Sequence, residues 1–297
     1  MLHSPFFYRG DSDSYIEKSY NYAFLLPASN YSFFKLIKEG AINASEAMDC
    51  AITFHEIDED PISLEMAHLT GIDGICIYPY LKYDNLSANL KKISAEGIPI
   101  IQIENEILSD ENSFFIGSNN FESGKAIANL ALKAKEDDLN IALIYSDKSP
   151  GLMSDGNLVE LGLNSILHDK INHLQTEVTS MNPLDAEQLT YQLMHQEQKL
   201  DVIVLTDPND TLVLVKTIID MNLVGSVKII GFGDDESIKE YIDKEIILGS
   251  IIRNPYDIGY SAVMALQELK TNGYTSAFVD TGISVLTKDG LKIGYNE

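Results

Sequence analysis

Short apolar runs alternate with longer amphipathic segments along most of the chain. Runs of strand length cover residues 22–26, 51–55, 74–78, 99–103, 113–116, 140–145, 174–178, 201–205, 228–231, 248–252 and 282–286. Segments long enough for helices separate most of these runs, and one face of the first segment holds Phe33, Phe34, Leu36, Ile37, Ala41 and Ala44. Strand–helix–strand repeats of this kind predict an α/β fold of the doubly wound type.

Several of the runs are continuously apolar and do not alternate with polar residues. Residues 74–78, 141–145 and 202–205 are the clearest examples. Strands have this pattern when helices cover both faces of a parallel sheet, and such sheets bind ligands at the carboxyl ends of their strands. The runs are too many for one open sheet, so we expect two sheets of about five or six strands each.

The charge balance limits the choice of partners. The chain has 297 residues, a length that favours two domains, with 21 Lys and Arg against 45 Asp and Glu and a net charge of −24. A surface this negative repels phosphate backbones, so we expect no nucleic acid as a partner. The two cysteines, Cys50 and Cys76, match no metal-binding spacing, and we interpret them as buried apolar side chains.

Sequence signatures of common catalytic sites are missing. There is no GxSxG elbow, P-loop, GxGxxG or HExxH motif in the chain. The six histidines are scattered, and residues 207–210 lack the spacing and the glycine of an EF-hand loop. We therefore expect a binding protein and not an enzyme, with no metal site and no cofactor.

Seven segments carry a family resemblance, and they occur in a fixed order. They are residues 22–34 (YAFLLPASNYSFF), 73–79 (DGICIYP), 98–105 (IPIIQIEN), 116–124 (IGSNNFESG), 229–234 (IIGFGD), 253–259 (RNPYDIG) and 280–289 (DTGISVLTKD). Together they resemble the landmarks of the type I periplasmic-binding-protein superfamily, near the ribose- and xylose-binding proteins. The segments are also similar to the effector domains of LacI-type repressors.

The resemblance implies a specific architecture. It predicts two similar doubly wound parallel-sheet lobes joined by a three-strand hinge, with the ligand held between them and hinge closure around it. It places the hinge crossings near residues 117–119, 253–254 and 279–282. The N-terminal lobe would then comprise residues 1–117 plus 254–279, and the C-terminal lobe residues 118–253 plus 280–297. The resemblance implies no catalytic activity.

Aromatic side chains follow the first and third strands. A sugar site needs aromatic faces against its C–H surface and planar polar groups for its hydroxyls. Tyr31, Phe33, Phe34 and Tyr78 are the aromatic candidates, and the resemblance places Phe33 and Phe34 at the family's sugar-stacking positions. The alternative is that these two phenylalanines belong to the core face of the following helix.

Polar candidates occupy the other strand ends. In chain order they are Glu104, Asn105, Asn157, Asp207, Asn209, Asp234 and Arg253, with Asp235 as an alternative to Asp234. Relatives place arginines where this chain has Asn105 and Asn157, which favours a neutral polyhydroxylated ligand. Arg253 and Arg9 are the only arginines. We expect Arg253 to bridge Glu104 or Asp234 and to donate to the ligand, the alternative being a purely structural hinge salt bridge.

The resemblance leads to one functional hypothesis and one alternative, and an enzyme on a doubly wound fold is a further alternative because fold alone does not settle function. The hypothesis is an extracytoplasmic receptor for a sugar, with a pentose such as D-xylose favoured, that serves an ABC permease or a membrane sensor histidine kinase of a two-component system. It would be secreted or membrane-anchored through a targeting segment that is absent here, because residues 1–20 carry no signal-peptide pattern. The alternative is a LacI-type effector domain, which the net charge of −24 and the lack of a basic helix before the first strand disfavour.

Overall fold

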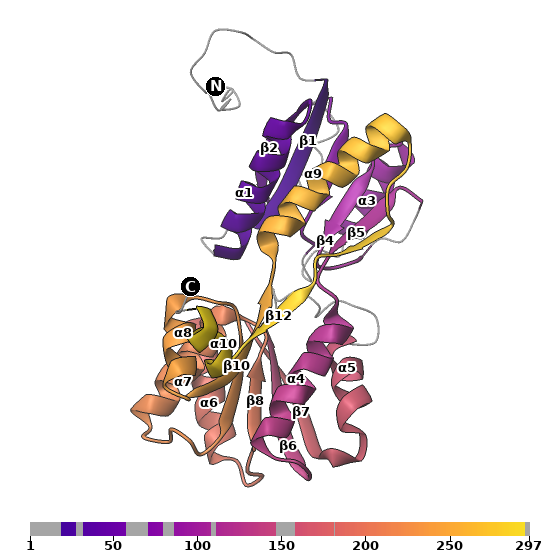
Figure 1. Cartoon of the computed structure of the whole chain (residues 1–297). Helices are drawn as coiled ribbons and strands as arrows, with labels where there is room; N and C mark the ends of the chain where they lie inside the picture. Colours follow the sequence, from indigo (N-terminus) through magenta and orange to yellow (C-terminus); the bar gives the residue numbers. More distant parts are fainter. Residues whose placement is uncertain are drawn as a thin grey trace.

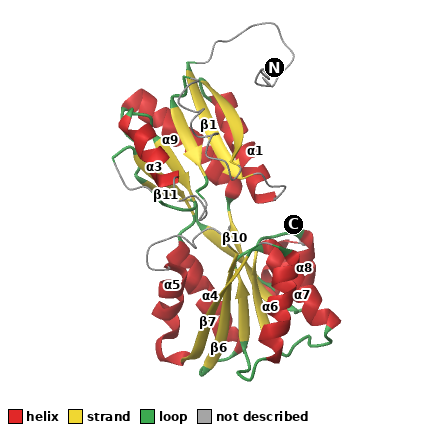
Figure 2. Cartoon of the chain, turned by 180° about the vertical axis from the view of Figure 1, so that it is seen from behind, coloured by secondary structure: helices red, strands yellow, loops and turns green. Residues whose placement is uncertain are grey.

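The strands of this chain form two separate sheets that meet at a narrow waist (Figures 1 and 2). The computed structural model describes residues 19–27, 32–57, 71–79, 86–107, 111–146, 158–180 and 182–294. Each sheet has six strands, and helices cover both of its faces. The predicted fold class, with two doubly wound lobes, is confirmed.

The N-terminal lobe is built on a fully parallel sheet in the order β11-β5-β4-β3-β1-β2. Its strands are β1 (Tyr20–Pro27), β2 (Cys50–Ile57), β3 (Gly74–Ile77), β4 (Ile100–Ile103), β5 (Ser113–Gly117) and β11 (Phe278–Asp280). One face packs against α1 (Ser32–Ala47) and α9 (Pro255–Asn272), and the other against α3 (Leu86–Ala95). Both β3 and β4 are buried along their whole length, as strands between two helical layers must be.

The C-terminal lobe repeats this plan in the order β12-β10-β9-β8-β6-β7. Its strands are β6 (Leu139–Ser146), β7 (Ile171–Thr179), β8 (Val202–Leu205), β9 (Lys228–Phe232), β10 (Ile247–Arg253) and β12 (Ile283–Leu286), of which β12 alone runs antiparallel to its neighbour. The layer on one face is α4 (Asn120–Ala134) with α5 (Leu158–Leu167). The other layer contains α6 (Pro183–His195), α7 (Pro208–Asp220) and α8 (Glu236–Asp243). A short 3₁₀ turn (His168–Lys170) precedes β7, and α10 (Lys288–Gly294) follows β12.

Three chain crossings join the lobes at the waist (Figure 1). The chain passes from β5 into α4, returns from β10 into α9, and crosses again between β11 and β12. Hydrogen bonds tie the first and third crossings together, since the Thr281 N–H donates to the Gly117 carbonyl at 3.0 Å and the Asn119 N–H donates to Asp280 Oδ1 at 3.2 Å. The first and third crossings are therefore connected to each other.

Each lobe contains one helix pair that packs at very short range. In the pair α1–α9 the contact is made at Gly40 and Gly259, and in the pair α4–α5 at Gly124 and Gly162. A Cβ added at any of these four glycines would lie 2.0–2.1 Å from a carbonyl oxygen of the partner helix. Side chains are thus excluded from both contacts, and the two lobes use the same device.

Differences from the sequence-based expectations are small. Every predicted strand is present, but the three-residue strand β11 was not predicted because it is short and half exposed. Leu36, which the helical pattern assigned to the buried face of α1, is 36% exposed. Cys50 and Cys76 are buried and not joined to each other, as expected. Within the described ranges, no helix has both the length and the apolar character needed to cross a membrane.

Candidate functional site

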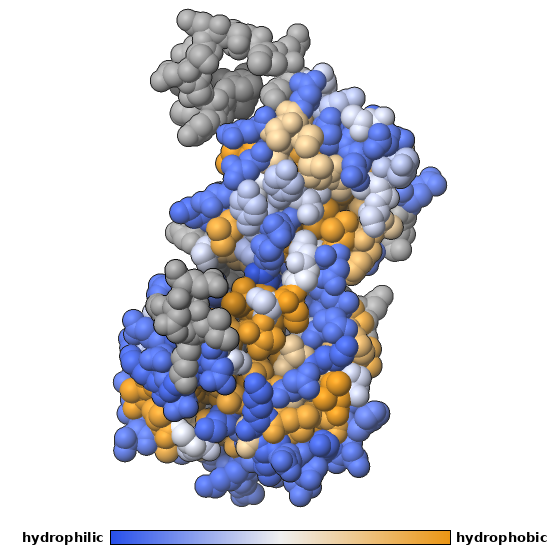
Figure 3. Space-filling model, viewed as in Figure 1, coloured by the Kyte–Doolittle hydropathy of each residue, from blue (hydrophilic) through white to orange (hydrophobic). Residues whose placement is uncertain are grey.

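A cleft of about 1130 Å³ lies between the lobes and is lined by residues of both. The lining side chains come from strand ends and from the segments that follow them: Phe33 and Phe34 from the start of α1, Tyr78 after β3, and Asp207 after β8. Arg253 ends β10 and completes the floor. The carboxyl ends of both parallel sheets therefore point at one cavity, the position where such sheets bind ligands. In the space-filling view, hydrophobic residues gather at the top of the lower lobe, directly below the waist (Figure 3).

Aromatic rings form the wall contributed by the N-terminal lobe. Phe34 and Tyr78 meet edge to face with centroids 5.0 Å apart, and Phe33 meets Phe34 in the same way at 5.3 Å. Tyr78 and Phe34 are 1% and 7% exposed and belong to the lobe's core, while Phe33 is only partly buried. The core position expected as an alternative thus applies to Phe34, although its ring also lines the cleft. Tyr31 lies outside the described residues.

The wall contributed by the C-terminal lobe contains carboxylates beside apolar side chains such as Phe232 and Ile251. Asp207 caps α7, because its Oδ1 accepts hydrogen bonds from the N–H groups of Asn209 at 2.9 Å and Asp210 at 3.1 Å. Burial raises the pKa of the Asp207 carboxyl, while these N–H groups and the charge of Arg253 oppose the rise. Asp207 and Asn209 both line the cleft. Residues 207–210 are therefore the start of a helix.

Two further carboxylates follow β9. Asp234 and Asp235 are exposed, and both line the cleft. Gly233 precedes them with a positive φ of 91° and lies so close to Pro208 that an added Cβ would be 2.8 Å from the ring. A glycine here lets the chain turn tightly toward the cavity. Either aspartate can accept a hydrogen bond from a ligand, so both alternatives stay open.

An ion pair across the waist forms the floor of the cleft. Arg253 Nε lies 3.7 Å from Glu104 Oε2, with the two side chains 8% and 0% exposed. The Arg253 guanidinium also lies over the ring of Phe232, 4.7 Å from its centroid. Of the two carboxylates considered from the sequence, the structure pairs Arg253 with Glu104. Burial raises the pKa of Glu104, and the Arg253 charge and the Ser118 hydrogen bonds lower it.

The structure brings together seven of the eleven candidates from the sequence. They are Phe33, Phe34, Tyr78, Asp207, Asn209, Asp234 and Arg253. Glu104 lies behind Arg253, while Asn105 is 3% exposed and donates from Nδ2 to the Pro79 carbonyl at 3.2 Å, outside the cleft lining. Asn157 lies outside the described residues, as Tyr31 does.

The sequence patterns did not identify some residues of the cleft. Thr281, Gly282 and Ser284 line it from the third crossing, and Asn182 lines it from the start of α6. Thr281 and Ser284 fall inside the motif at 280–289, so proximity to a predicted hinge crossing was the available signal. Asn182 had no such signal, because it lies outside all seven motifs.

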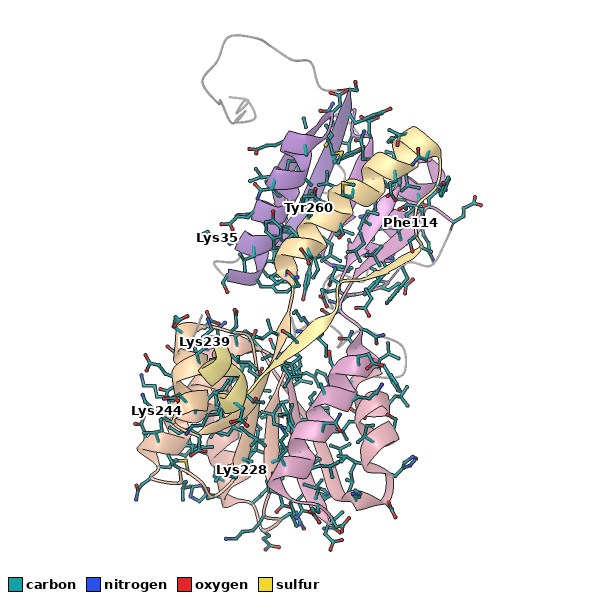
Figure 4. The ribbon with its side chains drawn as sticks, in the orientation of Figure 1. Lys35, Phe114, Lys228, Lys239, Lys244 and Tyr260 are labelled. Carbon is teal, nitrogen blue, oxygen red and sulfur yellow. The ribbon has the colours of Figure 1, made fainter. Side chains whose placement is uncertain are left out.

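Cations other than Arg253 are absent from the described lining of the cleft. The labelled lysines Lys35, Lys228, Lys239 and Lys244 lie on the outer surfaces of the lobes (Figure 4). No group of three or more His, Cys, Asp or Glu side chains within the described ranges is arranged to hold a metal ion. The cavity thus combines an aromatic wall, a wall of acceptors and a single guanidinium.

Comparison with known proteins gives one family match. The profile of a family described as "Periplasmic binding protein domain" matches residues 22–273. A comparison with curated proteins finds no match.

Three similar solved structures illustrate the likeness. GanP, a glucose-galactose binding protein from Geobacillus stearothermophilus, is 18% identical over 92% of this chain and 98% of its own, with a TM-score of 0.78. An ABC transporter solute-binding protein from Agrobacterium vitis, bound with alpha-D-tagatopyranose, is 20% identical over 92% of this chain and 96% of its own, with a TM-score of 0.79. XylFII in the XylFII-LytSN complex is 18% identical over 91% of this chain and 99% of its own, with a TM-score of 0.74. At such identities, the likeness establishes a shared fold.

Proposed function

We propose that this chain, which belongs to the periplasmic binding protein domain family, is an extracytoplasmic receptor for a sugar. The family consists of binding proteins and not of enzymes. The observation that carries the proposal is the cleft of about 1130 Å³ between the lobes, with aromatic rings on one wall and carboxylates on the other. A sugar ring has C–H surfaces that stack on aromatic rings and hydroxyls that donate to carboxylates. The two walls match these two properties of one ligand.

The charge of the cleft favours a neutral ligand. Asp207, Asp210, Asp234 and Asp235 line it together with the single guanidinium of Arg253. This excess of carboxylates repels sugar phosphates and other anions. We propose a neutral monosaccharide and favour a pentose such as D-xylose.

We propose that the receptor acts through a membrane partner. Similar structures include a solute-binding protein of an ABC transporter and a complex of XylFII with a second protein, LytSN. We propose an ABC permease or a membrane sensor histidine kinase as the partner, the two candidates that the family resemblance implies. The neighbouring genes distinguish them, because a transport receptor is expected beside permease genes and a sensor beside kinase genes.

Calorimetric titration tests the proposed ligand class. The panel contains D-xylose, L-arabinose, D-ribose, D-glucose and D-galactose, with D-glucose 6-phosphate as the anionic control. We expect at least one neutral sugar to bind and the phosphate to give no heat. Silence across every neutral sugar, or a preference for the phosphate, would overturn the proposal.

A further inference from the structure

The contact between Glu104 and Arg253 joins two lobes and not two parts of one lobe. Glu104 directly follows β4 in the N-terminal sheet, and Arg253 is the last residue of β10 in the C-terminal sheet. Their charged atoms lie 3.7 Å apart, beyond the length of an N–H···O hydrogen bond. Of the two side chains, only that of Arg253 lines the cleft.

The backbone at Glu104 is held in a costly conformation. Its φ of 63° lies in the left-handed region, which a residue with a side chain adopts only where its surroundings enforce it. The first hinge crossing packs close to this backbone, since a Cβ added at Gly117 would lie 2.9 Å from the Glu104 Cα. The Glu104 N–H also donates to the Ile116 carbonyl at 3.0 Å. The first hinge crossing thus fixes the backbone from which this carboxylate projects.

The two oxygens of the Glu104 carboxylate have different environments. Oε1 accepts hydrogen bonds from the Ser118 N–H at 3.1 Å and from the Ser118 hydroxyl at 2.8 Å. Oε2 is buried, accepts no hydrogen bond from the described residues, and faces Arg253 Nε. With Oε1 occupied and the side chain fully buried, Glu104 is directed at the guanidinium and not at the cavity.

We propose that Glu104 is a positioning residue that acts on the ligand only through Arg253. Its carboxylate attracts the Nε edge of the guanidinium across 3.7 Å without a hydrogen bond, and the Phe232 ring supports the flat face. The N-terminal lobe therefore contributes to the orientation of the cationic donor that lines the cleft. Because the pair spans the hinge, closure of the lobes changes the geometry of this donor. The effect of Glu104 on ligand binding rests on the proposed function. The effect of Glu104 on the orientation of Arg253 does not.

Side-chain NMR tests the pair without any ligand. The chain has only two arginines, Arg9 and Arg253, so a ¹⁵N–¹H spectrum contains at most two arginine Nε signals. Loss of one signal in Arg253→Lys assigns it. We expect Glu104→Gln to shift the Arg253 signal and Ser118→Ala to shift it less. The matched control Glu122→Gln, which removes an exposed carboxylate paired with Lys125, leaves it unchanged. An Arg253 signal that Glu104→Gln does not move would overturn the proposal.

A titration of the unmutated protein covers the case in which Glu104→Gln fails to fold. The charged groups that act on the pair are Asp280 beside Glu104 and Asp207 beside Arg253. As the pH falls and Glu104 becomes protonated, the Arg253 signal moves. Asp207→Asn and Asp280→Asn should each retain that movement. If either variant abolishes it, the titrating partner is not Glu104 and the proposal is wrong.

A double-mutant cycle with D-xylose tests the route to the ligand. We expect Glu104→Gln to weaken binding about tenfold in the unmutated background and less than twofold in Arg253→Met. Equal losses in both backgrounds would mean that Glu104 contacts the sugar directly, which overturns the positioning role. If no sugar of the panel binds, the proposed function fails, while the NMR measurement still decides whether Glu104 positions Arg253.

Discussion

Arg253 has the most unusual chemistry of the residues at the cleft. Among the described lining residues it is the one cation in a cavity with four carboxylates, and its side chain is 8% exposed. A guanidinium offers several N–H donors in a rigid plane, which suits the hydroxyls and ring oxygen of a sugar. The same charge limits the repulsion among the carboxylates around it.

Replacing Arg253 should weaken sugar binding strongly. Arg253→Ala removes the donors from the floor of the cleft, and we expect the affinity to fall more than about tenfold, or 1.4 kcal/mol. Calorimetry with the sugar that binds to the unmutated protein measures the loss. Lys239→Ala, on the outer surface and paired with Glu236, is the matched control and should leave the affinity unchanged. Equal affinity in Arg253→Ala would remove this residue from the site.

The two phenylalanines of the aromatic wall should respond differently. Phe34 is 7% exposed and belongs to the core, so Phe34→Ala should cost about 3–5 kcal/mol of stability besides weakening binding about tenfold. Phe33 is only partly buried, and Phe33→Ala should weaken binding with a smaller loss of stability. Thermal unfolding and calorimetry on both variants separate the two effects. If neither variant changes the affinity, the two rings belong to the core of the lobe and do not contact the sugar.

The raised pKa of Glu104 predicts how stability depends on pH. A carboxyl that holds its proton more tightly in the folded state contributes less stability as the pH rises above its ordinary value of 4.5. The glutamine side chain in the Glu104→Gln variant cannot ionise, so the variant does not lose stability in this way. We therefore expect the variant to gain stability relative to the unmutated protein as the pH rises from 4.5, and urea unfolding at a series of pH values measures it. A difference that is constant with pH would contradict the raised pKa.

The sequence predicted which residues surround the site better than where their side chains point. Aromatic and polar residues after strand ends were expected to converge, and seven of the eleven candidates do line the cleft. Glu104 and Asn105 follow β4 as predicted. The backbone at Glu104 is left-handed, and the Asn105 side chain donates a hydrogen bond to the Pro79 carbonyl and does not line the cleft. A left-handed glutamate has no signature in the sequence, because it depends on Gly117 from the next strand.

At the scale of elements, the two close helix pairs give the sharpest test of packing. Gly124→Ala and Gly259→Ala each place a Cβ about 2.0–2.1 Å from a carbonyl oxygen, so the helices must separate. We expect each to destabilise its lobe by about 1–3 kcal/mol, as overpacking does. Gly290→Ala is the control, since the nearest atom to its added Cβ is 4.0 Å away and alanine favours helix. Thermal unfolding measures all three, and equal stability of all variants would contradict the short contact.

Strands with a continuous apolar pattern were predictable from the sequence. Strand β11, which depends on pairing with its neighbour, was not. The runs that became β3, β6 and β8 are continuously apolar and buried, so local sequence and tertiary position agree. Strand β11 has three residues with exposed ends, and it exists because it pairs with β5. The assignment of Leu36 to the core face was wrong for a related reason: the cleft leaves that part of α1 uncovered.

At the scale of the whole molecule, the waist predicts a change of shape on binding. The described lobes are joined by three crossings and enclose an open cavity of about 1130 Å³ between them. A ligand that contacts both walls stabilises the closed arrangement. Small-angle scattering should therefore give a smaller radius of gyration after addition of the sugar that binds in calorimetry. Binding without compaction would contradict hinge closure.

The lobe boundaries at residues 117, 253 and 279 stay a prediction.

The position of α9 late in the chain determines when the N-terminal lobe can complete its core during synthesis. This helix supplies Ile258, Ala262, Val263 and Leu266 to a core whose first strand begins at Tyr20. At roughly 5–20 residues per second, a ribosome needs about ten seconds or more to deliver α9 after β1 has emerged. During that interval α1 lacks the helix that packs against Gly40, and a nascent chain halted after Arg253 would lack β11 as well as β12. Both halves of the receptor therefore finish folding only near the end of translation.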